Sequence, residues 1–172
     1  MKKVAFVVLA MALLTLCFAA VPVMAKPTDG LKVAAGFGPG PETVENEGEY
    51  TVLNGNIVQI KGYELIYPQG WVYIGGMGVI PVYSYNLWQM EYNLKSLTVI
   101  VNSEVEWTSL ADDENGWTGR FQWKLYNFIP GVETDSSYQI QGVMHGFGDY
   151  EGITIYINID ANHLNMYALI HQ

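Results

Sequence analysis

Two stretches decide the fold: GRFQWKLYNF (119–128) and ITIYINID (153–160). In both, apolar residues occupy every second position and polar residues the positions between. The apolar positions are Phe121, Trp123, Leu125, Ile153, Ile155, Ile157 and Ile159. Alternation of this period is typical of antiparallel strands with one buried and one wet face. Between the two stretches, HGFGDYEGI (145–153) supplies the glycines and the aspartate that a tight connection needs.

The preceding residues predict more strands of the same kind. Asn54-Gly55 lies between two apolar runs, a strong hairpin signal. One face of the second run is expected to hold Val58, Ile60, Gly62 and Ile66, and this strand is expected to end at PQGW (68–71). Pro81 indicates an edge strand or a bulge, because proline cannot donate to a ladder.

The number of such segments favours an all-β protein. About seven to nine strands follow one another at short spacing, and we find no amphipathic helix pattern longer than two turns. We therefore predict a single antiparallel β-barrel of about eight strands, with a β-sandwich as the alternative.

The N-terminal region predicts export. Met1–Ala25 has two lysines, an apolar run and small residues before a predicted cleavage ahead of Lys26, as in a signal peptide. The alternative is an uncleaved membrane anchor. Residues 26–48 are rich in Gly, Pro and Glu and predict a flexible leader, so the barrel domain is expected at 49–172. We expect a secreted, extracytoplasmic protein without membrane contact after signal cleavage.

Charge and cysteine content exclude several partners and sites. The chain has 17 acidic and 8 basic side chains, a formal net charge of −9, which disfavours nucleic acid and anionic lipid surfaces. Cys17 is the only cysteine and falls in the predicted signal. The exported domain therefore has neither disulfides nor thiolate metal sites, which fits a prokaryotic exported protein.

Two glycine-rich motifs carry a family resemblance. Gly116-Trp117-Thr118-Gly119 before an alternating strand, and GFGDYEG (146–152) before the closing strands, resemble the second half of allene oxide cyclase-like barrels. The resemblance covers about Thr98 to Gln172, and Phe147 departs from the small residue of the family pattern. It implies a small barrel, related in shape to lipocalins, whose interior can hold an apolar ligand. No catalytic residue of the plant cyclases matches a position here, so their activity is not implied.

Aromatic residues are abundant: five Trp and twelve Tyr, concentrated between residues 63 and 123. Such rings fill a barrel core, and rings with polar tips also line cavities for flat or apolar molecules. Strand parity suggests an inward-facing set that would bind a small apolar or aromatic ligand. This set is Tyr83, Tyr85, Trp107, Trp123 and Met144.

Catalytic and metal chemistry receive little support. The three histidines are His145, His163 and His171, and nothing in their spacing makes them converge as zinc ligands must. Asp112–Gly116 offers oxygen ligands for calcium but lacks the spacing of an EF-hand, and Asn115-Gly116 explains it better as a hairpin turn. Glu104 and Glu106 share a wet strand face, without an obvious partner for a glycosidase pair. We predict no catalytic residue, no metal and no cofactor.

Three functional hypotheses remain. The first is a secreted, non-catalytic barrel that binds a small apolar or aromatic molecule. The second is a cyclase-like or isomerase-like enzyme acting on a lipid-like substrate, which a buried carboxylate or histidine facing a cavity would favour. The third is an extracellular surface-interaction module for protein or polysaccharide, which a packed barrel with exposed rings would favour.

Overall fold

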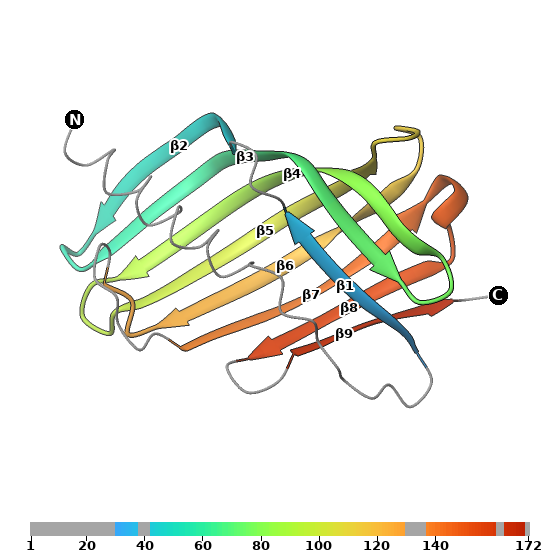
Figure 1. The fold of residues 1–172 in the computed structure, drawn as a ribbon. Helices are drawn as coiled ribbons and strands as arrows, with labels where there is room; N and C mark the ends of the chain where they lie inside the picture. The colour runs from blue at the N-terminus through green and yellow to red at the C-terminus, as the bar shows by residue number, and fades with distance from the viewer. Residues whose placement is uncertain (1–29, 38–41, 130–136, 161–163, 171–172) are drawn as a thin grey trace.

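The computed structural model describes residues 30–37, 42–129, 137–160 and 164–170, and these are almost entirely strand (Figure 1). The elements are β1 (Leu31–Phe37), β2 (Thr43–Leu53), β3 (Ile57–Ile74), β4 (Gly78–Asn93), β5 (Thr98–Ser109), β6 (Gly116–Tyr126), β7 (Ser137–Phe147), the 3-10 helix η1 (Gly148–Tyr150), β8 (Ile153–Asp160) and β9 (Leu164–Ile170). The all-β prediction is confirmed. Among these residues, no helix is long and apolar enough to cross a membrane.

Eight of the nine strands close into a ring. The sheet runs β1-β9-β8-β7-β6-β5-β4-β3-β2, and β1 pairs with β3 as well as with β9. Every pairing is antiparallel, with Val33 opposite Ile74 on one side of β1 and Leu31 opposite Ala168 on the other. This single closed sheet is the barrel-like arrangement that the strand count predicted.

β3 joins the ring to the one strand outside it. It is 18 residues long. One edge pairs with β4, whereas the other pairs first with β2 and then, from Gly70 to Ile74, with β1. In Figure 1, β1 (blue) crosses in front of the sheet, while β2 lies beside the first half of β3. β2 therefore extends beyond the ring, and nearly all of its residues are exposed.

The inward faces form one apolar core. The predicted alternation is confirmed in β6 and β8, whose apolar sets are buried, and β5 shows the same alternation in burial. Rings pack closely inside: Trp88 lies 5.7 Å from Trp123, and Trp107 lies 5.9 Å from Phe121, between centroids. The largest fully buried side chains are those of Trp88, Trp117, Tyr63 and Leu65.

The predicted flexible leader is wrong where the structure describes it. β1 and the first residues of β2 fall within residues 26–48, so the boundary at residue 49 lies inside a strand. The short apolar patch at 31–37 supplies the strand that closes the ring, with the Val33 side chain buried in the core. The predicted signal peptide, Met1–Ala25, lies outside the described residues.

Two bulges in β3 explain the errors made for that strand. The β3–β4 register shifts between Lys61 and Tyr63, where Gly62 has a φ of 73°. Because one extra residue reverses the parity, Ile60 and Tyr63 both face inward. Ile66 therefore does not share the face of Ile60, as the uninterrupted alternation predicted.

The second bulge lies at Pro68 and Gln69, the first two residues of PQGW. The register shifts again between Tyr67 and Gly70, so Pro68 lies in the irregular step and the strand continues to Ile74. Pro81 does not lie in a bulge, but it lies at a local edge of β4, as predicted. It lies one residue beyond Val82–Ser109, the last β4–β5 pair, and its carbonyl accepts from the Leu110 N–H at 3.0 Å. No ladder donor is needed at that point.

Candidate functional site

A row of six amide side chains crosses the outer face from β4 to β9. Each member lies directly opposite the next in the strand register. We call these residues the amide row: Gln89, Asn102, Gln122, Gln141, Asn158 and Asn165. Since neighbouring strands are about 4.8 Å apart, the row is about 24 Å long and runs across the strands.

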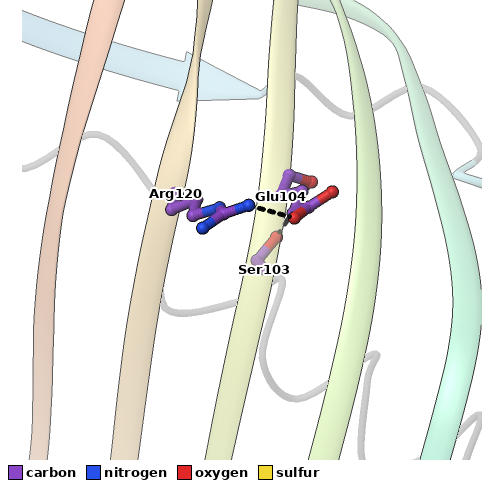
Figure 2. Close-up of polar contacts among 3 residues, drawn as sticks. All are labelled: Ser103, Glu104 and Arg120. Atoms are coloured by element: carbon purple, nitrogen blue, oxygen red, sulfur yellow. Dashed lines mark hydrogen bonds and ion pairs between the residues drawn. The ribbon is translucent and has the colours of Figure 1, made fainter.

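A second row runs parallel to the first, two residues along each strand. We call it the mixed row: Leu87, Glu104, Arg120, Val143, Tyr156 and Tyr167. Figure 2 shows Arg120 of β6 and Glu104 of β5 pointing toward one another, with Arg120 Nη2 2.9 Å from Glu104 Oε1. Tyr156 and Tyr167 stack with their ring centroids 5.2 Å apart and their planes 16° apart.

The two rows line a partly open depression of about 1210 Å³. The amide row carries no charge, and the only charged side chains among the described lining residues are Arg120 and Glu104, which pair with each other. The acidic residues of β2, by contrast, lie on the strand outside the ring. The depression is therefore a surface without net charge on an acidic protein, and both amide and apolar side chains line it.

The amide row keeps hydrogen-bonding capacity for a partner. Within it, Gln122 Nε2 donates to Asn102 Oδ1 at 3.0 Å. A primary amide has two N–H donors and a carbonyl oxygen with two lone pairs, so both side chains retain further donors and acceptors after this bond. The row can thus donate and accept at each strand that it crosses.

The five residues predicted to bind a ligand separate into two groups. Trp107, Trp123 and Met144 face inward as predicted and are buried in the core. Tyr83 and Tyr85 do not, because β4 points Ser84 and Asn86 inward instead. Asn86 Nδ2 donates to Ser84 Oγ at 3.0 Å and to the Leu65 carbonyl at 3.3 Å, so these polar groups are satisfied inside.

One carboxylate lies close to the aromatic core. Burial raises the pKa of Glu42, just before β2, and leaves its Oε2 without a hydrogen-bond partner in the described part of the chain. Burial, and then the charge of Glu42, raise the pKa values of Tyr63 and Tyr67 well above 10. Each of these groups therefore keeps its proton to a higher pH than the same group would in water.

The other candidate groups have structural roles. His145 is exposed as predicted, and its Nδ1 lies 3.3 Å from Thr154 Oγ1. In the Asp112–Gly116 turn, the Asp112 carboxylate accepts from Glu114 N and Asn115 Nδ2. No group of three or more His, Cys, Asp or Glu residues able to hold a metal occurs in the described residues. His163 and His171 lie outside them.

The same turn is tied to η1 by the two motifs of the family resemblance. Asn115 Oδ1 accepts from the Asp149 N–H at 2.6 Å, and Trp117 stacks on Tyr150 with centroids 4.2 Å apart. The two motifs thus meet where β6 begins and β7 ends.

Comparison with protein-family models, curated proteins and solved structures finds no match for this chain.

Proposed function

We propose that this chain is a secreted, non-catalytic binding protein that recognises its partner on the outer face, at the amide and mixed rows. The features of an export signal in Met1–Ala25 support secretion. Exposed, uncommitted polar groups lining one depression support binding rather than chemistry. This is the surface-interaction hypothesis, now centred on amides rather than on exposed rings.

The single observation that carries the proposal is the register of the six amides. Asn is depleted in strands, and an ordinary solvated face mixes charges of both signs. Cross-strand pairs contribute only about 0.2–1 kcal/mol each, so the row gains little stability from its composition. A continuous uncharged row over six strands is therefore better explained by a partner than by folding.

The test uses two glutamines of one strand. Gln141 lines the depression, whereas Gln139, two residues earlier on the same face of β7, does not. Arrays of glycans, peptides and lipids are probed with the wild type, Gln141→Ala and Gln139→Ala. We expect a ligand whose affinity falls about tenfold in Gln141→Ala only, a loss of about 1.4 kcal/mol. Equal binding by all three proteins would refute the proposed surface.

A second candidate function follows from the interior. The indole Nε1 atoms of Trp88 and Trp117 are buried and have no hydrogen-bond partner among the described residues. A buried donor without a partner costs about 1–3 kcal/mol, and an acceptor on a bound small molecule would remove that cost. This observation favours the small-ligand barrel that the allene oxide cyclase-like resemblance implies.

Native mass spectrometry of protein purified from its own source tests the interior candidate. A stoichiometric small molecule that is retained by the wild type and lost from Trp88→Phe, which keeps the apolar ring surface but not the N–H, would support it. Protein that carries no small molecule would leave the outer face as the proposed site.

A further inference from the structure

The amide row matches a partner whose groups both donate and accept hydrogen bonds. Each amide of the row presents N–H donors and a carbonyl acceptor. A phosphate or carboxylate polymer would use the donors alone, and an ammonium polymer would use the carbonyl oxygens alone. Hydroxyl groups use both, because each hydroxyl donates one bond and accepts others.

The charge of the depression and of the whole chain limits the chemical class of the partner further. The depression is neutral, since Arg120 and Glu104 neutralise each other at 2.9 Å. The whole chain has a formal net charge of −9, so an anionic polymer is repelled at long range. A cationic polymer would be drawn instead to the exposed glutamates of β2, which are Glu45, Glu47 and Glu49.

The length and direction of the row indicate an extended chain. The row crosses six strands and presents an amide about every 4.8 Å. A single small sugar would leave most of it uncovered. At one end of the mixed row, the stacked pair of Tyr156 and Tyr167 adds an apolar surface with polar tips, suited to the C–H face of a sugar ring.

We infer that the amide row binds a neutral, hydroxyl-rich polysaccharide that lies across strands β4 to β9. This inference rests on the proposed function, because it names the ligand class of the same surface. An extended peptide fits less well, since peptides pair with an exposed strand edge, and the amides of β4 to β8 lie on the face of strands that are paired on both sides.

Calorimetry on the mature protein tests the ligand class. The probes are a length series of neutral glucan oligosaccharides, polygalacturonate as the anionic polymer and chitosan as the cationic one. We expect binding of the neutral glucans, with affinity that rises with chain length until the row is covered and that changes little between low and high NaCl. Affinity should fall about tenfold in Gln141→Ala and stay unchanged in Gln139→Ala.

Each other outcome overturns a defined part of the inference. Binding of polygalacturonate or chitosan alone, still lost in Gln141→Ala, rejects the neutral class but keeps the outer face as the binding surface. If Gln141→Ala binds as well as the wild type, both the polysaccharide and the outer face are rejected. The same follows if no probe in this series or in the arrays binds. Self-association that is lost in Gln141→Ala identifies a second copy of this chain as the occupant and rejects the polysaccharide.

Discussion

Gly119 marks a close approach of two strands in the ring. A Cβ at this position would collide with the carbonyl oxygen of Val143 and would lie 2.7 Å from Met144 Cα, both backbone atoms of β7. We expect Gly119→Ala to lower the free energy of unfolding by about 2–3 kcal/mol, because backbone must move to admit the methyl group.

Gly62→Ala is the control for this prediction. A Cβ at Gly62 meets nothing within 4 Å, and only its φ of 73° opposes the substitution, at a cost of roughly 1–2 kcal/mol. Urea denaturation compares the two variants. A smaller loss for Gly119→Ala than for Gly62→Ala would contradict the close approach.

Glu42 predicts a pH-dependent contribution to stability. Burial raises its pKa above the ordinary value of 4.5, so the folded state disfavours the charged form. The stability associated with Glu42 is therefore fully present below the unfolded pKa and is lost as pH rises through the folded pKa. We expect Glu42→Gln to melt at a higher temperature than the wild type near pH 7, and this difference to shrink toward pH 4.

The matched control is Glu49→Gln, on the exposed part of β2. Melting temperatures are measured across the same pH range for both variants and the wild type. A Glu42→Gln difference that stays constant with pH, or that Glu49→Gln reproduces, would contradict the role of burial.

Inward residues were predictable wherever a strand alternates without interruption. Trp107, Trp123 and Met144 were placed correctly on that basis. Tyr83 and Tyr85 were placed on the wrong side because the prediction followed their aromatic rings. The other face of β4 carries the apolar residues that are buried, which are Ile80, Val82, Trp88 and Met90. The Asn86 amide is tolerated inside because it donates hydrogen bonds to Ser84 and to the Leu65 carbonyl. Leu65 belongs to the neighbouring strand β3, so the sequence of β4 alone could not predict this bond.

β1 is the element on which closure of the ring depends. The Lys32 carbonyl accepts from the Gly75 N–H at 2.8 Å, so Ala34, two residues on, points its backbone groups toward the same edge and its partner Tyr73 in β3. Proline at position 34 removes an N–H donor from the pairing between β1 and β3 that closes the ring. We expect Ala34→Pro to cost about 1–3 kcal/mol and to raise hydrogen exchange in β1, β9 and the second half of β3 together.

The corresponding control lies on β2. Glu45 falls at the register shift between Val44 and Asn46, on a strand that pairs with β3 alone. Glu45→Pro should therefore leave exchange in β9 unchanged and cost little stability. If hydrogen exchange in β9 rises equally in both variants, closure of the ring does not depend on β1.

The elements themselves were largely predictable, and their irregularities were not. Period-two patterns identified β6 and β8 correctly. The bulge at Gly62 adds one residue without any change in composition, so an alternation that runs through it appears continuous in the sequence. β1 was missed because its seven residues show no clear local pattern and lie beside a Gly- and Pro-rich stretch. The strand is stabilised by pairing with β3 and β9, which are distant in the sequence. Predicting the amide row would likewise have required knowledge of the register of six strands.

The topology of the whole ring predicts slow folding. Its closing contacts join residues far apart in the sequence, as in the pair Leu31 and Ala168. Proteins dominated by such contacts fold in about milliseconds to seconds. Stopped-flow tryptophan fluorescence measures this relaxation, since four of the five tryptophans are buried. Complete refolding within microseconds would contradict the closed topology.

The pairing of β1 with β9 places the first and last strands of the ring side by side and antiparallel, with Leu31 near the end of β9. A short turn could therefore connect β9 directly to β1, as the turns connect the other neighbours. New ends could then be opened at Asn54-Gly55, the tight turn between β2 and β3. The ring thus has no inherent starting strand, and a circular permutant should retain both its closed sheet and its amide row.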